Sequence, residues 1–466
     1  MRVTTTSWHS PSDGPVPNPL AQRAEEMFGR NFIDVLDKSS DEILRANLPR
    51  GELLDVARTL RQDIGGLVRG EMRLGRRGAL FLEHTHAQDQ SHTREMLMHR
   101  LPFSIRGFLD TDYPVVLDRS LDRLVSLIAA SYILDRVVMD FQPEGPRDSP
   151  VRSIHNLEEL SQKMVLVVGA TAVGKDTIRS ALVQDLHPEL STGQRVDRDT
   201  LSEKAKDIGI ILPVKLTGRQ RRADEADGVD YWFFDGREGR PPETRLLPIS
   251  HGKHHLPYSY MYAGHMYGFA LEDIQPSESG RETVIPGLRE RLESDDTRMI
   301  LCGGGTTPEA VHFKKIFPKA TVIYLIPTPE EDGLLTMERE VISRWWGRSI
   351  GEMIHPIHSG MQRLEGSIRE ALNMGNIAPL ASILEDPGIR RMHDVMSADQ
   401  IAAAASIEEK ARFRLIEVMP QVGQALMLAH GMDFTVVPNK RGQVELAVSQ
   451  IRNVLRQRGV IEESLR

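Results

Sequence analysis

Residues 169–177 carry the most specific chemical pattern in this chain. They read Gly-Ala-Thr-Ala-Val-Gly-Lys-Asp-Thr, which is G-x-x-x-x-G-K followed by a carboxylate and a hydroxyl. Glycines let successive backbone N–H groups turn toward one centre, a helix N-terminus adds partial positive charge, and the lysine can reach the outer phosphates of a nucleotide. The pattern predicts a phosphate-binding loop; the simpler alternative is a glycine turn with a surface lysine.

The residues on either side of the loop favour phosphate binding. Met164–Val168 (MVLVV) reads as a strand and residues 176–186 read as a helix, which is the context that gives the pattern its meaning. We therefore expect this loop to bind ATP. Its candidate ATP-binding residues are Gly169, Ala170, Thr171, Ala172, Val173, Gly174, Lys175, Asp176 and Thr177.

The position after the lysine departs from the usual pattern. In P-loop proteins it is Ser or Thr, whose hydroxyl binds Mg²⁺. Here it is Asp176, and the hydroxyl follows at Thr177. A carboxylate can also bind Mg²⁺, directly or through water. Asp176 and Thr177 are therefore the candidate metal ligands, for a Mg²⁺ ion that accompanies ATP.

A second segment, residues 217–233, combines arginines with a phenol. Arg219 and Arg222 lie three residues apart, and Tyr231 enters a predicted strand after an acidic turn. Guanidinium groups are suited to bidentate recognition of phosphate. A solvated basic turn would account for Arg-Gln-Arg-Arg alone, but not for the ordered Asp-Gly-Val-Asp-Tyr-Trp-Phe-Phe that follows. The segment therefore predicts a site for the phosphate of a second substrate.

This second segment resembles the acceptor-binding motif of guanylate kinases, T-T-R-x-P-R-x-x-E-x-x-G-x-D-Y-x-F. Residues 264–268, Gly-His-Met-Tyr-Gly, are similar to the family's G-N-Y-Y-G and place Tyr267 as a second phenol on the acceptor phosphate. The resemblance covers residues 161–460. The motif positions in register are Arg219, Arg222, Glu225, Gly228, Asp230, Tyr231 and Phe233.

Later segments extend the resemblance to the lid and to the adenine site. Arg344 and Arg348 fall on the lid's R-L-x-x-R, Arg363 resembles a later lid arginine, and Asn439 falls where the family has an asparagine near the adenine. The resemblance implies that phosphoryl transfer rests on positioning and charge neutralisation. It assigns the catalytic charges to Lys175, Arg344, Arg348 and Arg363, and adds Asn439 to the ATP-binding residues.

The positions that read the guanine base differ from the family's. The family's hydroxyl falls on Lys215, its glutamate falls near Tyr258, and its acidic strand end, I-L-D-x-D, becomes Ile-Leu-Cys-Gly-Gly at 300–304. A site that loses such partners loses discrimination between bases, and metal placement then rests on the loop or on the substrates. The implied acceptor-binding residues are Lys215, Arg219, Arg222, Tyr231, Tyr258 and Tyr267.

Three glycines at 303–305 end a predicted strand and precede a predicted helix. Thr307 reads as the N-cap, Pro308 as the first helical position and Glu309 as an acid in the first turn. Free N–H groups here could bind a further phosphate or a sugar hydroxyl. A tight turn required by close packing is the alternative.

Strand and helix patterns alternate after residue 160, which predicts an α/β fold: a P-loop nucleoside monophosphate kinase-type parallel sheet flanked by helices. A helical insertion is expected at about 365–430. The strand candidates are Met164–Val168, Ile210–Lys215, Tyr231–Phe234, Met299–Leu301, Thr321–Ile326 and Phe434–Val437.

The first third of the chain has a different character. Residues 1–19 contain four prolines and are expected to be a disordered leader, and 142–160 read as a linker. Between them, 20–141 are expected to form a mainly α-helical domain, because segments such as 121–128 repeat apolar residues at helical spacing. We recognise no family in this helical domain, which could bind a protein partner. It would precede a guanylate kinase-like domain at 161–460.

Composition excludes several classes of protein. The 466 residues include 58 basic and 66 acidic side chains, a net charge of −8 that gives no sign of nucleic-acid binding. Cys302 is the single cysteine, which excludes an intrachain disulfide and fits a reducing compartment. The longest apolar runs are shorter than the ~20 residues that a membrane span needs. We expect a cytoplasmic protein whose partners are small-molecule nucleotides.

Three functions remain open from the sequence. The first is ATP-dependent phosphoryl transfer to a nucleoside monophosphate, GMP or a related phosphorylated acceptor. The second is a binding or scaffold module without turnover, favoured by the lost acidic strand end but disfavoured by Lys175 and the lid arginines. The third is a sugar-phosphate kinase, which Lys215 and Asp176 would suit.

Overall fold

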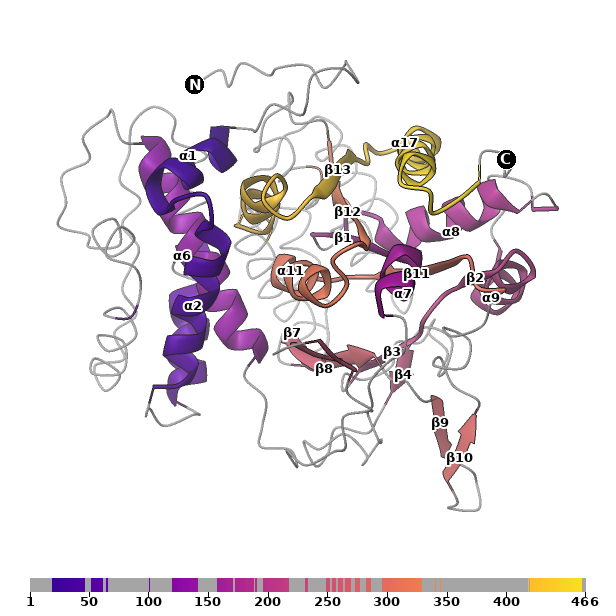
Figure 1. The fold of residues 1–466 in the computed structure, drawn as a ribbon, viewed down its shortest axis with the longest axis horizontal. Coiled ribbons are helices and arrows are strands. Elements are labelled where there is room, and N and C mark those ends of the chain that lie inside the picture. The colour runs from indigo at the N-terminus through magenta and orange to yellow at the C-terminus, as the bar shows by residue number, and fades with distance from the viewer. Residues whose placement is uncertain are drawn as a thin grey trace, which may run out of the picture.

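The structure is a computed structural model, with a five-stranded parallel sheet at its centre (Figure 1). No helix among the described residues is long and apolar enough to cross a membrane. The residues described are 19–46, 52–61, 64–65, 100, 120–140, 157–170, 172–187, 189–190, 196–217, 231–233, 249–251, 254–256, 259–262, 265–269, 273–276, 282–285, 296–328, 340, 344, 418 and 420–462.

The central sheet has the strand order β13-β12-β1-β11-β2, with every neighbouring pair parallel. Buried parallel strands are expected to be continuous apolar runs, since helices cover both faces. Every described residue of β1 and β12 is indeed buried. The predicted α/β fold class is therefore confirmed. The strands are β1 (Met164–Gly169), β2 (Ile210–Ile211), β11 (Met299–Gly303), β12 (Thr321–Ile326) and β13 (Phe434–Pro438).

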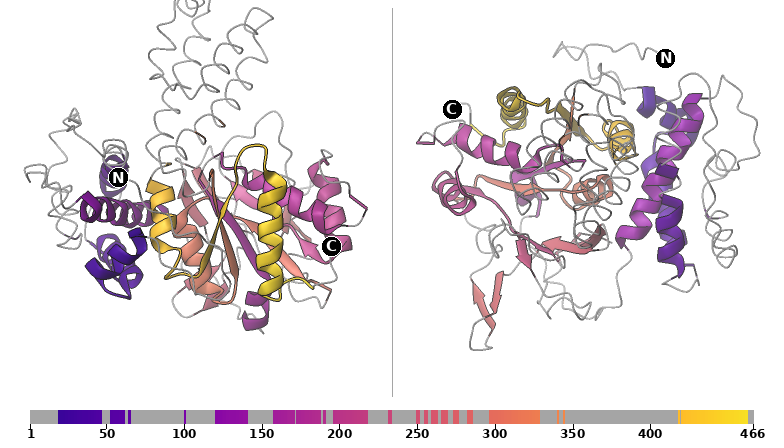
Figure 2. Two further views of the ribbon diagram at one scale, coloured as in Figure 1. Left: turned by 90° about the horizontal axis from the view of Figure 1, so that it is seen from above. Right: turned by 180° about the vertical axis from the view of Figure 1, so that it is seen from behind.

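Alternate residues of β1 face opposite sides of this sheet, as the two-residue period of a strand requires. Val165 and Val167 pack with α8 (Lys175–Leu186), α9 (Arg198–Asp207) and α17 (Val444–Gln457). Leu166 and Val168 belong to a second cluster, with α11 (Thr307–Ile316) and the helix at 420–428. The views in Figure 2 show these helical layers on either side of the strands. A further helix, α7 (Leu157–Lys163), leads directly into β1.

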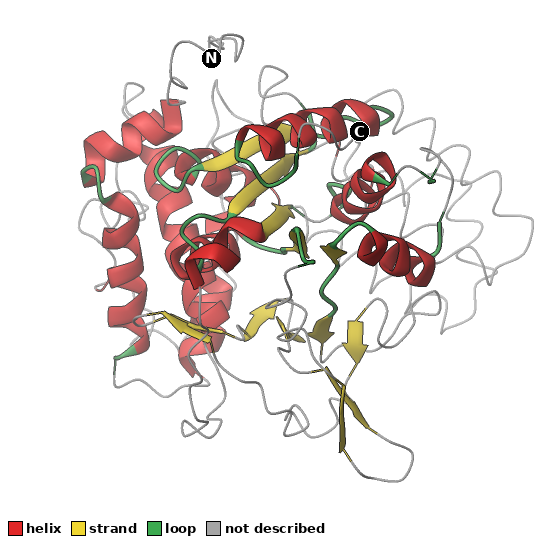
Figure 3. Cartoon of the chain, turned by 45° about the vertical axis from the view of Figure 1, so that its right-hand side comes forward, coloured by secondary structure: helices red, strands yellow, loops and turns green. Residues whose placement is uncertain are grey.

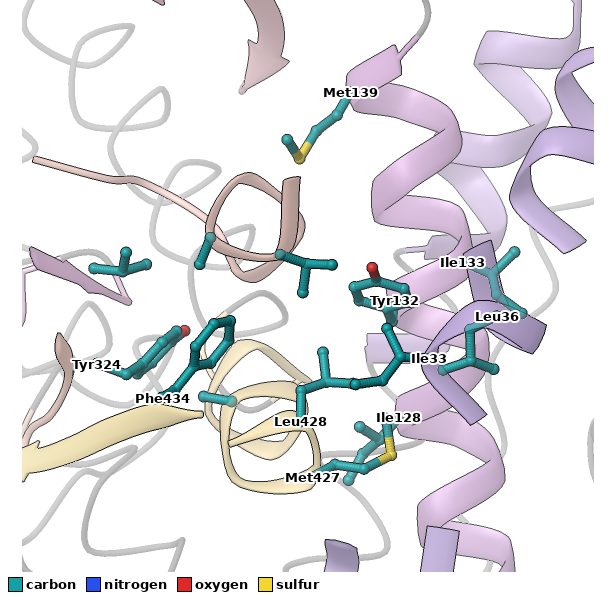
Figure 4. Close-up of a cluster of buried hydrophobic side chains, with 14 of the residues drawn as sticks. Ile33, Leu36, Ile128, Tyr132, Ile133, Met139, Tyr324, Met427, Leu428 and Phe434 are labelled. Atoms are coloured by element: carbon teal, nitrogen blue, oxygen red, sulfur yellow. The ribbon is translucent and has the colours of Figure 1, made fainter. Parts of the chain in front are cut away.

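The helices of the first third of the chain extend the second cluster. They are α1 (Pro19–Phe28), α2 (Phe32–Leu44), a helix at 52–61 and α6 (Ser120–Asp140). Every residue of α6 from 125 to 139 is buried, so this helix is covered on all sides. It packs against α1 and α2 and also contacts α11 (Figure 1). Figure 4 shows Ile133 near Leu36 of α2, and Ile128 near Met427.

Charged side chains join these helices to the rest of the molecule. Asp37 of α2 accepts a hydrogen bond from Tyr132 Oη at 2.8 Å and pairs with Arg136 of α6 and Lys315 of α11. Burial raises the pKa of Asp37, but the charges of Arg136 and Lys315 outweigh it and leave that pKa below its ordinary value. Burial, together with Asp37, raises the pKa of Tyr132 well above its usual range. The Asp37 carboxylate is therefore held in its charged form.

A second polar group connects α6 to the helix at 420–428. Gln424 Nε2 donates to Ser131 Oγ at 3.0 Å and to Asp135 Oδ2 at 2.8 Å. Asp135 also pairs with Arg61 from the helix at 52–61. Buried polar groups are costly unless they are paired, so these contacts fix how the three helices align.

A second, four-stranded sheet lies beside the parallel one, with the order β4-β3-β8-β7 (Figure 3). Its strands are β3 (Lys215–Thr217), β4 (Tyr231–Phe233), β7 (Ser259–Tyr262) and β8 (His265–Phe269). The predicted strand Ile210–Lys215 is wrong as one element. It is divided into β2 and β3, which belong to different sheets, because Pro213 has no N–H to donate to a ladder.

Four short strands form two hairpins that the sequence did not predict. They are β5 (Ile249–His251) with β6 (His254–Leu256), and β9 (Asp273–Pro276) with β10 (Glu282–Ile285). The β9–β10 hairpin projects away from the parallel sheet (Figure 1). Most of the predicted leader and of the insertion at about 365–430 lies outside the described residues.

Candidate nucleotide and acceptor site

The phosphate loop connects the carboxyl end of β1 to the first residue of α8. Gly174 precedes the helix with φ of 91°, a left-handed conformation that favours glycine. A Cβ at Gly174 would lie 2.8 Å from Asn439 Nδ2, so a side chain there would also displace that amide. Ala172 has φ of 61°. The strand, loop and helix predicted around Gly169 and Lys175 are therefore present; Thr171 lies outside the described residues.

Lys175 turns back over this loop. Its Nζ donates to the carbonyl oxygens of Gly169 at 2.7 Å and Ala170 at 3.0 Å. Gly169 is the last residue of β1 and Ala170 follows it in the loop, so the ammonium group lies against the loop itself. Asp176 and Thr177 follow in the first turn of α8 and are exposed.

Two residues from distant parts of the chain contact the same loop. Asn439, just after β13, donates from Nδ2 to Val173 O at 2.7 Å. Arg344 donates from Nη1 to Val173 O at 3.0 Å and from Nη2 to Asn439 O at 2.6 Å, and its Nε pairs with Glu340 at 2.9 Å. The fold thus brings the predicted residues Lys175, Arg344 and Asn439 to one loop. Arg348 and Arg363 lie outside the described residues.

The second sheet brings three of the predicted acceptor residues together. Lys215 of β3 is directly opposite Tyr231 of β4, and Thr217 is opposite Tyr267 of β8. Residues opposite each other on paired strands project from the same face. The rings of Tyr231 and Tyr267 meet edge to face, with their centroids 6.0 Å apart. Arg219, Arg222 and Tyr258, also predicted here, lie outside the described residues.

Glu309 contacts one of the predicted acceptor residues, although sequence reasoning had placed it only on a helix. Its Oε1 lies 2.5 Å from Lys215 Nζ and its Oε2 accepts from Gly305 N at 2.6 Å. The side chain of Glu309 is 1% exposed and that of Lys215 is 10% exposed. Lys215 therefore does not present a bare charge to an acceptor, because a carboxylate neutralises it.

The glycine turn at 303–305 serves packing more than ligand binding. Gly304 N donates to Val167 O at 2.8 Å and Gly305 N donates to Glu309, so two of the three N–H groups already have partners. A Cβ at Gly304 would lie 2.7 Å from Val168 Cγ2. The helix cap is Thr306 and not the predicted Thr307: Thr306 Oγ1 accepts from Glu309 N at 3.3 Å.

The end of β11, the strand beside β1, offers no carboxylate to a magnesium ion. Such an ion prefers carboxylate and other oxygen ligands. Burial raises the pKa of Cys302 to about 12, so the strand end carries a neutral thiol. Asp176 Oδ1 faces Arg179 Nη1 at 3.7 Å. Within the described part of the chain, no three His, Cys, Asp or Glu side chains are placed to share a metal ion.

Together, β1, the phosphate loop and α8, set in a parallel sheet, define a P-loop fold of the nucleoside monophosphate kinase type. No protein-family model matches the chain. The guanylate kinases of two strains of Thermus thermophilus are each 24% identical over 209 residues, covering 45% of this chain and 70% and 69% of the relatives. The crystal structure of guanylate kinase from Anaplasma phagocytophilum is 16% identical, covers 48% of this chain and 95% of its own, and gives a TM-score of 0.21.

The chain is therefore a distant homologue of guanylate kinases over about 45% of its length. This agrees with the resemblance read from the acceptor motif. The rest of the chain has no assigned relative.

Proposed function

We propose that this chain transfers the γ-phosphoryl group of ATP to a nucleoside monophosphate. The observation that supports the proposal is that both predicted half-sites follow the carboxyl ends of strands of the parallel sheet. The phosphate loop follows β1, and β3, which bears Lys215 in the second sheet, is the next strand after β2. Ligands of open α/β sheets bind at the carboxyl ends of the strands.

The loop side suits the donor nucleotide. Lys175 places a positive charge at the loop, and the N-terminus of α8 adds its partial charge. Asn439 is buried, and its Oδ1 has no hydrogen-bond partner among the described residues. An amide oxygen of this kind accepts from an amino group such as that of adenine. Both features support ATP as the donor.

The second-sheet side suits the phosphate of the acceptor. The phenols of Tyr231 and Tyr267 would donate to its oxygens, together with Arg219 and Arg222 from the segment between β3 and β4. An acceptor phosphate oxygen would attack the γ-phosphorus as the bond to the bridging β–γ oxygen breaks and ADP leaves. Arg348 and Arg363 would neutralise negative charge on the phosphoryl group as it is transferred.

The pairing of Lys215 with Glu309 helps to decide which class of acceptor this chain would bind. A sugar-phosphate kinase would gain from an extra bare cation, but Lys215 is paired with Glu309. Because a charged lysine replaces the neutral hydroxyl of guanylate kinases, we expect GMP to be preferred over other monophosphates by less than about a hundredfold in kcat/KM.

A coupled ADP-release assay tests the proposal. ATP is supplied with GMP, AMP, CMP, UMP or a sugar phosphate, and the Lys175→Ala variant serves as the blank. ADP release that depends on a monophosphate and disappears in the variant supports the kinase. Release with a sugar phosphate alone would point to the other kinase class. Nucleotide binding by calorimetry without any ADP release would identify a binding module instead.

A further inference from the structure

Arg179, one turn into α8, lies between the phosphate loop and the end of β11. Its Nη2 donates to Leu301 O at 3.0 Å, and its Nη1 is 3.7 Å from Asp176 Oδ1. The side chain is 18% exposed. Helical side chains lean toward the N-terminus of their helix, which brings this guanidinium toward the turn that begins with Lys175. No sequence pattern singled out this arginine.

This guanidinium lies beside the end of β11, the strand from which P-loop proteins usually offer a carboxylate to a metal ion. In such proteins a Mg²⁺ ion neutralises the outer phosphates, held by a hydroxyl after the loop lysine and by a carboxylate on a neighbouring strand. Here β11 is the strand beside β1, with Gly303 opposite Val167. Its end offers a neutral thiol and glycines, and the residue after Lys175 pairs with Arg179.

We infer that the Arg179 guanidinium supplies the positive charge that a metal ion held by the protein supplies at other phosphate loops. The inference rests on the proposed function, because it concerns how the same loop binds ATP. Any Mg²⁺ at this site then arrives with the nucleotide, coordinated by phosphate oxygens and water. The loop itself binds the triphosphate without the ion.

Gly303 is the residue that makes room for this arrangement. A Cβ built at Gly303 would lie 2.9 Å from Arg179 Nη1, 3.5 Å from its Cζ and 3.6 Å from its Cδ. All three nearest atoms belong to the arginine, whose end can move. A methyl group at 303 should therefore displace the guanidinium while the surrounding backbone stays in place. This gives a second way to perturb the charge without deleting it.

The test measures ATP binding to the full chain by calorimetry, once with Mg²⁺ and once with EDTA. We expect the wild-type protein to bind ATP in EDTA within about tenfold of its affinity with Mg²⁺. Arg179→Gln should lose about tenfold to a hundredfold in EDTA, the loss typical of one charged hydrogen-bonding group, and should regain part of it with Mg²⁺. Gly303→Ala should shift in the same direction by a smaller factor.

Arg452→Gln is the matched control. Arg452 of α17 pairs with Asp185 of the same helix α8 at 2.9 Å, at the other end from the loop. This variant should bind ATP as the wild type does in both buffers. Circular dichroism melting of each variant establishes that it is folded.

The outcomes separate this inference from the proposed function. Wild-type binding that needs Mg²⁺, or an Arg179→Gln variant as tight as wild type in EDTA, would overturn the inference and leave the kinase proposal standing. Absence of ATP binding in both buffers would overturn both.

Discussion

Lys175 is the residue on which ATP binding most depends. Its Nζ lies against the loop carbonyls of Gly169 and Ala170. We expect Lys175→Ala to weaken ATP binding by about tenfold to a hundredfold, since one charged hydrogen-bonding group contributes about 1.5–3 kcal/mol, and to abolish ADP release. Calorimetry measures the first and the coupled assay the second. Lys204→Ala, which removes a partly exposed lysine paired with Glu189 at 2.9 Å, is the control. If both variants bound ATP with equal affinity, Lys175 would not be part of the ATP site.

The Lys215–Glu309 pair predicts a strong coupling between its two residues. Removing either partner leaves a buried charge uncompensated, which costs about 3–5 kcal/mol. We therefore expect Lys215→Met and Glu309→Gln each to lower the free energy of unfolding strongly, while the double variant loses much less than their sum. Urea unfolding of the wild type, the two single variants and the double variant measures the coupling energy of this double-mutant cycle. Additive losses would mean that the two groups do not interact.

At the scale of elements, the junction of α2, α6 and α11 should respond to acid through Asp37. Its pKa is lower in the folded protein than its ordinary value. Such a carboxyl stabilises the fold above its unfolded pKa, about 4, and that contribution is lost as the pH falls through the folded-state value. We expect the melting temperature of the wild type to drop steeply below about pH 4.

Two variants check that Asp37 causes this drop. Asp37→Asn removes the titrating group, and Lys315→Met removes one of the charges that lower its pKa. Both variants should melt lower than wild type at neutral pH and should lose less on going to acid, because less of the pH-dependent contribution remains. Melting curves of the wild type and both variants, recorded from about pH 3 to 7, measure this difference in pH dependence. If the melting temperature of both variants fell as steeply with pH as that of the wild type, Asp37 would not be the cause of the drop.

The sequence predicted those elements whose signal is local. β1 and β12 are continuous apolar runs, so their place inside a covered parallel sheet could be predicted. The strands between 249 and 285 are three to five residues long and lack such a run, so they were missed. The Ile210–Lys215 prediction followed apolar character and neglected the missing N–H of Pro213.

The residues of the candidate site also fall into two groups: those with a local sequence signal, and those that only the fold brings together. The loop from Gly169 to Lys175 is one continuous segment, and its strand and helix context is readable from the sequence. Lys215 and Glu309 are 94 residues apart, and only the fold brings them together. Arg179 was missed because an arginine on a helix has no distinguishing spacing. Pairing across the fold, and not residue type, therefore limits what sequence alone predicts.

At the scale of the whole molecule, the N-terminal helices and the sheet share one apolar cluster. Residues of α1, α2 and α6 lie in the same buried group as Leu166 and Tyr324 of the sheet. A fragment that begins at residue 157 would expose the faces of α11 and of the helix at 420–428 that α6 covers. Exposed apolar patches of this kind lead to association.

We therefore expect the fragment that begins at residue 157 to aggregate, while the full chain unfolds in a single transition. Light scattering and scanning calorimetry measure the two behaviours. A chain that lacks only residues 1–18, and so keeps α1, is the matched control and should behave as the full chain does. A soluble fragment that melts cooperatively and binds ATP would show that the helices form an independent unit.

The burial of α6 also has a consequence for synthesis on the ribosome. Asp135 and its partner Gln424 are 289 residues apart in the chain. At about 5–20 residues per second, roughly 15 to 60 s pass between the emergence of one and of the other. Throughout that interval α6 has an apolar side with no covering helix from the C-terminal part of the chain. We expect the nascent chain to depend on a chaperone that shields α6 until the helix at 420–428 has emerged from the ribosome.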